Sequence, residues 1–251
     1  MSETPAHAIS ATEAWLRDAF DHVLHELSLF GRTFAAFAVQ PGSSAGAWQT
    51  GERSFMNPLG FGATAAGVYW TVASVLAALW PIAGAQMDNS IADQLTSAVG
   101  PYVHYGLLGV TMHCALRGLG SRRRILGSIG IAFFAGGSVG TVTALLLTGA
   151  TRWFGHRRGT SFLQLSSGDL VPLALLVAGV LFYALVCLVL ARALMRLHGV
   201  VGWKAVLAAG FAMVVTALLF GNLLPEGSYG WRPYIRIGLE DGFDVSFGFH
   251  G

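Results

Sequence analysis

The residues Ile125–Ala150 read ILGSIGIAFFAGGSVGTVTALLLTGA. No charged side chain occurs in this segment of 26 residues. About 20 apolar residues in a helix are enough to cross the hydrocarbon core of a bilayer, which is roughly 30 Å thick. The segment therefore predicts a transmembrane helix.

Small residues recur at every fourth position of the same segment, which brings them onto one face of the predicted helix. They are Ser128, Ala132, Gly136, Gly140 and Ala144. Side chains of this size let two helix backbones approach closely and gain contacts that lipid cannot match. The pattern predicts a helix-packing interface, either within the chain or between two chains.

The pattern Gly-x-Ser-x-Gly also occurs here, as Gly136 to Gly140 around Ser138. In hydrolases this motif presents its serine on a sharp turn between a strand and a helix. The residues around Ser138 predict an unbroken apolar helix instead. The sequence therefore indicates no catalytic role for Ser138.

Four further apolar segments are close to the length of a membrane span. They are 58–87, 98–116, 170–194 and 203–224. Hydrophobic residues make up 54% of the chain and charged residues only 11%, whereas soluble proteins average about 25% charged residues. We expect an all-α polytopic membrane protein with a five-helix transmembrane domain over residues 55–224.

The N-terminal region, residues 1–54, differs from the spans. Apolar residues spaced three and four apart predict an amphipathic helix over 10–38, with a stripe that includes Leu16, Phe20 and Phe34. Two positions are open for this helix: docked against the bundle or a partner helix, or lying in the membrane interface. At the other end of the chain, residues 225–251 form a Gly-rich and aromatic tail.

The basic residues indicate an orientation. With the N-terminus in the cytoplasm, ten Lys and Arg residues lie inside and five outside, although Arg152, Arg157 and Arg158 are among the five. Basic residues accumulate in cytoplasmic loops. The sequence predicts an integral protein of a bacterial inner membrane, with a cytoplasmic N-terminus and the C-terminal tail on the non-cytosolic side.

Polar residues near the second segment are the candidates for a site. His104 and His113 lie within the segment, and ionisable groups at membrane depth are functional candidates. A basic cluster follows, able to attract anionic lipid headgroups or simply to anchor the topology. It consists of Arg117, Arg122, Arg123 and Arg124.

Known cofactor and metal motifs are absent from the sequence. The histidines near Glu26 lack the zinc-helix spacing, because position 29 is Leu29. No phosphate-binding loop or dinucleotide fingerprint occurs. A net charge of +2 does not suggest nucleic-acid binding. We expect no cofactor, no metal and no nucleic acid.

The layout resembles the Yip1-domain membrane proteins. Phe55-Met56-Asn57-Pro58-Leu59-Gly60-Phe61 is similar to the way those proteins enter their first helix through a proline. His113, followed by Arg117-Gly118-Leu119-Gly120-Ser121, is similar to that family's histidine and Gly-rich turn. The resemblance covers residues 55–224 and implies five helices and a role in membrane organisation.

These observations favour a non-catalytic membrane scaffold or assembly subunit. Its partners would be membrane lipids and other membrane protein subunits, or further copies of itself. The alternative is a small transporter or permease subunit with a polar cavity near His104 and His113. A third hypothesis is an intramembrane enzyme that uses Ser138 or His113.

Overall fold

The computed structural model describes residues 6–52, 54–81, 91–158, 170–223, 232–238 and 244–250. These residues form mainly helices. The elements are α1 Ala6–Val39, α2 Ser43–Gln49, α3 Pro58–Leu79, α4 Ile91–Gly118, α5 Ile125–Ala135, the π-helix η1 Gly136–Gly140, α6 Thr141–Arg158, α7 Leu170–His198, α8 Gly202–Leu223, β1 Arg232–Gly238 and β2 Asp244–His250.

Four helical segments within the described residues are long and apolar enough to span a membrane. They are Pro58–Leu79, Ile125–Arg157, Val177–His198 and Gly202–Leu219. The second segment predicted from the sequence also forms a helix, α4, but α4 is not among the four. Its polar residues, including His104 and His113, lower its hydropathy. The chain is a helical membrane protein with four candidate spans.

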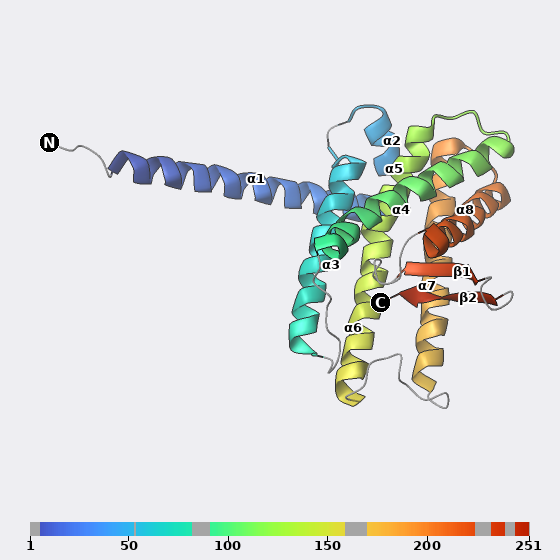
Figure 1. Ribbon diagram of the computed structural model, residues 1–251. Helices are drawn as coiled ribbons and strands as arrows, with labels where there is room; N and C mark the ends of the chain where they lie inside the picture. The colour runs from blue at the N-terminus through green and yellow to red at the C-terminus, as the bar shows by residue number, and fades with distance from the viewer. Residues whose placement is uncertain are drawn as a thin grey trace.

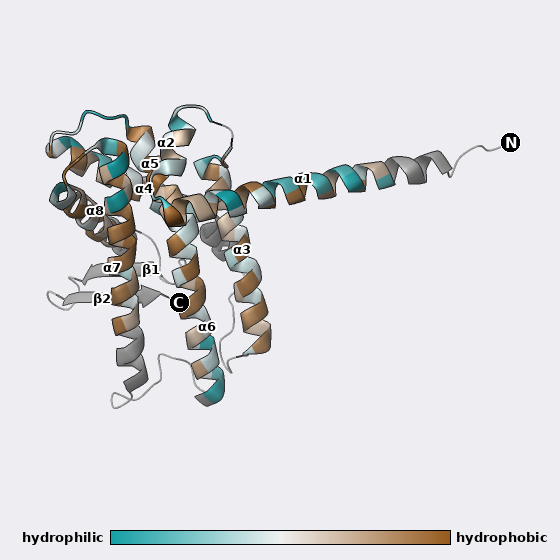
Figure 2. Ribbon diagram, turned by 180° about the vertical axis from the view of Figure 1, so that it is seen from behind, coloured by the Kyte–Doolittle hydropathy of each residue, from teal (hydrophilic) through white to brown (hydrophobic). Residues whose placement is uncertain are grey.

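The bundle has two directions of packing (Figure 1). Helices α3 and α7 run roughly parallel to the continuous helix formed by α5, η1 and α6. Helices α4 and α8 pack together and run obliquely across this set, where α4 contacts α5 and α8 contacts α7. Helix α1 projects sideways from the bundle. Apolar residues cover much of α3 and α7, whereas the far end of α6 is hydrophilic (Figure 2).

Local chemistry explains the bounds of α3. The side chain of Asn57 accepts a hydrogen bond from the Gly60 backbone N–H, which caps the helix, and Pro58 occupies the first helical turn. The helix ends at Leu79, before Pro81, because the residue preceding a proline disfavours helical geometry. The sequence predicts this span to run on to residue 87, and residues 82–90 lie outside the described part of the chain.

Aromatic rings from α1, α3 and α5 pack together inside the bundle. The ring of Phe61 in α3 lies 4.8 Å from that of Phe30 in α1 and 5.4 Å from that of Phe134 in α5. Phe37 of α1 packs against Phe134, with 6.0 Å between ring centroids. Side chains from three helices therefore meet at one apolar cluster.

Helix α1 covers the predicted range 10–38 and has two different surroundings. In its C-terminal part, Phe37 and Thr33 are fully buried. Thr33 Oγ1 accepts a hydrogen bond of 2.9 Å from the Met56 backbone N–H, which joins α1 to the segment before α3. Farther from the bundle, Leu16 and Phe20 are 54% and 63% exposed.

Residues 232–238 and 244–250 form a pair of strands, where the sequence predicts a Gly-rich and aromatic tail on an all-α chain. Strands β1 and β2 pair antiparallel, from Arg232 with His250 to Gly238 with Asp244, and β1 packs near α8. Apolar residues at every second position from Val245 to Phe249 have the period of a strand. This alternation, more than the aromatic content of the tail, is the signal that indicates a hairpin.

Candidate functional site

Two helix-to-helix turns lie side by side at one end of the bundle. The first turn connects α4 to α5, and Gly120 at its start has a φ of +94°. Hydrogen bonds from Gly120 N to Arg117 O and from Ser121 N to Leu116 O close the end of α4, as in a Schellman motif. Glycine suits this position because other residues are strained at such a φ.

The second turn connects α7 to α8 and ends α7 in a similar way. Gly199 has a φ of +65°, and its N–H donates to the carbonyl of Met195. A single bond of this kind is the simpler left-handed helix cap. Helix α8 then begins at Gly202, only three residues later.

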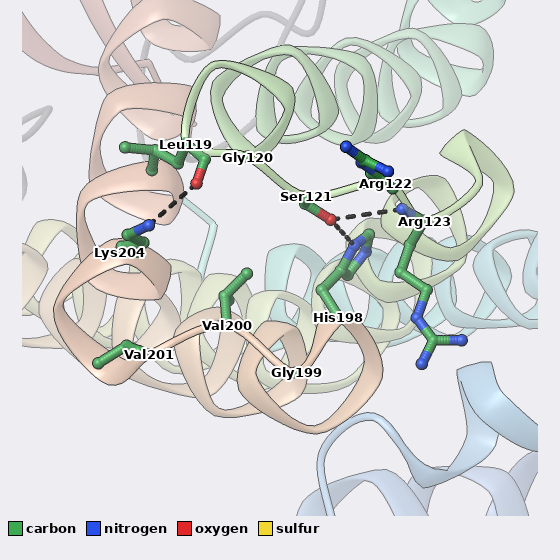
Figure 3. A pocket seen from close by; sticks show the side chains of 10 residues that line it. All are labelled: Leu119, Gly120, Ser121, Arg122, Arg123, His198, Gly199, Val200, Val201 and Lys204. Carbon is green, nitrogen blue, oxygen red and sulfur yellow. Dashed lines mark hydrogen bonds between the residues drawn. The ribbon is translucent and has the colours of Figure 1, made fainter.

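A pocket of about 390 Å³ lies between the two turns. This volume falls in the range of small-molecule sites, about 300–1,000 Å³. Figure 3 shows its lining. The lining residues are Leu119, Gly120, Ser121, Arg122, Arg123, His198, Gly199, Val200, Val201 and Lys204.

His198 holds the two sides of the pocket together. Its Nδ1 lies 3.2 Å from the Ser121 hydroxyl, and its Nε2 lies 3.1 Å from the hydroxyl of Ser128 in α5. The imidazole is buried, with 7% of its surface exposed. Because both ring nitrogens have partners, His198 fixes the end of α7 against the first turn and against α5.

Lys204 connects the second turn to the first. Its Nζ donates a hydrogen bond of 3.1 Å to the carbonyl of Leu119 (Figure 3). The same nitrogen lies 5.7 Å from the centre of the Trp203 ring. An ammonium group has three protons to donate. The bond to Leu119 uses one of them, so Lys204 can bind another acceptor at the same time.

Two of the four arginines of the predicted basic cluster line this pocket, and two do not. Arg122 and Arg123 line it and are exposed, and their side chains leave the turn in different directions (Figure 3). Arg124 precedes the first residue of α5 and is not part of the lining. Arg117 faces another group, because its Nε lies 3.4 Å from Nε2 of His113.

The two predicted intramembrane histidines lie apart. Nine residues of helix separate His104 from His113, which corresponds to roughly 13 Å along α4. The ring of His104 lies 5.7 Å from that of Tyr105, edge to face. His113 is buried, and neither histidine lines the pocket described above.

The small-residue stripe lies against other helices of the same chain. Ser128 and Ala132 are fully buried, and Ser128 contacts His198 of α7. A Cβ atom added to Gly136 would lie 2.1 Å from the Tyr105 ring of α4, whereas one added to Gly140 would have only ordinary contacts, the nearest at 3.7 Å. Gly136 is thus in much closer contact than Gly140. Ala144 is partly buried.

Ser138 lies inside the continuous helix, within η1. Its hydroxyl donates to the carbonyl of Phe134, one turn earlier, and the side chain is buried. This bond occupies the hydroxyl proton. Among the described residues, no group of three His, Cys, Asp or Glu side chains is arranged to hold a metal ion.

Sequence reasoning did not single out His198 or Lys204 of the pocket, and it named Ser121 only as the end of a Gly-rich turn. The dipeptide His198-Gly199 at a predicted helix end and the Gly120-Ser121 pair are typical of helix C-terminal turns. These signals indicate two turns, but not that the turns meet.

Comparison with known proteins gives no relative for the chain, since no family model, curated protein or solved structure matches it. The class of protein therefore follows from the fold. Long apolar helices with exposed residues such as Leu181, Leu188 and Phe211 define a helical integral membrane protein.

Proposed function

We propose that the chain is a non-catalytic membrane scaffold or assembly subunit that binds partner proteins and lipids through its helices. The projecting part of α1 carries this proposal. Its stripe residues Leu16, Phe20 and Leu27 are 54%, 63% and 47% exposed, while Phe37 on the same helix is fully buried. Contiguous exposed apolar residues are typical of sites that bind a protein or a membrane.

The rest of the bundle gives this helix a firm base. Phe30 stacks on Phe61, and Thr33 bonds to the Met56 backbone, so the C-terminal part of α1 is attached to α3 by both apolar and polar contacts. An attached base lets the projecting part present its stripe in one direction. This arrangement suits assembly better than catalysis, which needs converging reactive groups.

The topology belongs to the same proposal. We take α4 as a fifth, more polar span, and the N-terminus as cytoplasmic in a bacterial inner membrane with the C-terminus outside. Seven basic residues flank the two turns of the pocket and support a cytoplasmic position for this end. They are Arg117, Arg122, Arg123, Arg124, Arg192, Arg196 and Lys204.

The resemblance to Yip1-domain proteins supports a role in membrane organisation. The residues that carry it have clear structural tasks: Asn57 and Pro58 start α3, and Gly120 closes α4. Starting a helix and closing a turn are roles that suit a five-helix membrane domain.

Copurification from native membranes in mild detergent tests the proposal. The full chain is compared with the stripe variant Leu16→Gln/Phe20→Gln/Val23→Gln. The matched control replaces three exposed residues on the opposite side of α1, as Asp18→Gln/His22→Gln/His25→Gln.

We expect a defined larger complex with the full chain and the control, and its loss with the stripe variant. Mass spectrometry identifies the partners. A complex that persists in the stripe variant would contradict the proposal. So would a monomer that carries a specific small molecule.

A transporter or permease subunit is the second candidate. It is favoured by His113, whose Nδ1 is buried without a hydrogen-bond partner among the described residues. An unpartnered buried polar group costs about 1–3 kcal/mol of stability, and a functional role is one reason to retain it. Flux of a substrate into vesicles that is lost on His113→Ala, with the fold intact, would favour transport over assembly.

A further inference from the structure

We infer that the pocket between the α4–α5 and α7–α8 turns binds a phosphate group, carried by an anionic lipid headgroup or present as free phosphate. The inference deepens the lipid-binding part of the proposed function, because it names the ligand chemistry and the residues. Lys204 and Ser121 form its fixed part, and the exposed Arg122 and Arg123 form its rim.

The described lining of this pocket carries three basic side chains, Arg122, Arg123 and Lys204, and no acidic side chain that would neutralise them. The seven basic residues named above lie between 117 and 204, and the sequence has no Asp or Glu from 94 to 168 or from 170 to 225. None of the described lining residues carries a carboxylate. An anion in the pocket would thus meet several positive charges and no competing acid.

The donors in the pocket suit phosphate oxygens. Lys204 retains two protons beyond the one it gives to Leu119. Arginine binds phosphate through two parallel N–H groups, and Arg122 and Arg123 are exposed and long enough to swing toward a ligand. Charged donors from the α4–α5 turn and from the first turn of α8 therefore line the same pocket, with Lys204 bonded in place and the two arginines at the rim.

The start of α8 adds to this preference. The first hydrogen bond of the helix runs from Ala205 N to Val201 O, so the N–H groups before Ala205 lack helical partners. The N-terminus of a helix has a partial positive charge and binds phosphate readily. Val200, Val201 and Lys204 place this end of α8 in the pocket lining.

His198 is a positioning residue in this arrangement. Its bonds to Ser121 and Ser128 hold the α4–α5 turn against α7, and so hold Arg122 and Arg123 near Lys204. The imidazole is buried and both its nitrogens are engaged. It therefore shapes the pocket and does not contact the ligand.

A general attraction of the basic end for any anion is the competing explanation. The pocket variant is Arg123→Gln/Lys204→Gln, which removes one cation from each turn. The matched control is Arg192→Gln/Arg196→Gln, which removes two exposed cations of α7 that do not line the pocket. Both variants lose the same charge from the same end of the bundle.

Binding is measured by thermophoresis on the full chain in mild detergent. The probes are dioctanoyl phosphatidic acid, dioctanoylglycerol, which has the same acyl chains without phosphate, and inorganic phosphate. We expect phosphatidic acid to bind and dioctanoylglycerol not to. The pocket variant should bind phosphatidic acid about tenfold more weakly or worse, since each basic residue near a membrane surface contributes appreciably.

The control variant should bind phosphatidic acid within about threefold of the parent, since Arg192 and Arg196 do not line the pocket and their exposed charges are screened by salt. If the Arg123→Gln/Lys204→Gln variant does not fold, Arg122→Gln/Arg123→Gln changes only exposed side chains and takes its place. Lys204→Arg, which keeps the charge, should retain binding.

The outcomes separate the ligand sources. Binding of phosphatidic acid alone supports the lipid headgroup, and equal binding of inorganic phosphate supports a free phosphate as the ligand. Equal weakening in the pocket and control variants, equal binding of dioctanoylglycerol, or no binding of any probe would overturn the inference. A copurified complex that survives in the pocket variant leaves the assembly proposal standing whatever the pocket binds.

Discussion

The two parts of α1 carry one apolar stripe and have different surroundings. In the C-terminal part, Phe30 stacks on Phe61 and Phe37 packs on Phe134, inside the bundle. In the projecting part, Phe20 and Leu27 have the same helical spacing but are largely exposed. The difference shows that hydrophobic periodicity identifies a helix face that is able to pack. Which residues of that face are buried depends on where the neighbouring helices lie.

The largest effect is expected from Phe37→Ala in the docked part. Removing this fully buried ring leaves a cavity against Phe134, and large-to-small changes of this kind cost about 3–5 kcal/mol. Thermal unfolding in detergent measures the loss. Phe20→Ala is the control, expected within about 0.5 kcal/mol because the side chain is exposed. Equal losses would mean that the stripe is packed along its whole length.

A somewhat smaller effect is expected from Gly137→Ala. The added Cβ would lie 2.7 Å from the ring of Phe61, on which Phe30 of α1 stacks. Overpacking of this kind costs about 1–3 kcal/mol. Gly140→Ala in the same π-helix is the control, because its nearest contact would be 3.7 Å.

Limited proteolysis shows whether the Gly137 change releases α1. We expect faster cleavage of α1 in Gly137→Ala and parental cleavage in Gly140→Ala. Parental behaviour of both variants would mean that the docked part does not depend on the position of Phe61.

Thr33→Val tests the polar contact of the docked part. The variant keeps the shape of the side chain but removes the oxygen that accepts from the Met56 N–H. A buried N–H without a partner costs about 1–3 kcal/mol, and the same thermal unfolding experiment detects it. Thr71→Val, on an exposed position of α3, controls for the change of residue type. A loss no greater than that of Thr71→Val would show that water replaces Thr33 as the partner.

The smallest effect on stability is expected from removing residues 1–27. The projecting part makes few contacts with the bundle, and the docked residues Phe30, Thr33 and Phe37 stay in place. The unfolding free energy should change by no more than about 0.5 kcal/mol, as for other exposed positions. A large loss of stability would show that the projecting part packs on the bundle. It would contradict the difference between the two parts of α1.

Much of the secondary structure follows from local sequence. Apolar length predicts the helices from α5 to α8, and Pro58 marks the start of α3. The end of α3 at Leu79 is not predicted, because the predicted span runs on past Pro81. The α4 helix was predicted too, although its polar residues keep it out of the four candidate spans. Local signals suffice for these features because helix length and caps depend on residues within a few positions of each other.

The candidate site follows much less from sequence. The charges of Arg122 and Arg123 are visible in the chain, but their meeting with Lys204 and His198 depends on two turns about 80 residues apart. The stripe from Ser128 to Ala144 likewise predicts a packing face without its partners. Only the tertiary structure distinguishes Gly136, which lies against Tyr105, from Gly140, which has room.

The sequence by itself thus determined a membrane protein of long apolar helices, with basic residues gathered at helix ends and a stripe on α1. The tertiary structure decided that only the C-terminal part of that stripe packs, that α4 and α8 cross the other helices, and that the α4–α5 and α7–α8 turns line one pocket. The physical reason is the separation along the chain of the residues that interact. Hydrophobic periodicity and helix caps act between residues close in the chain, whereas packing and site formation join residues that only the fold brings together.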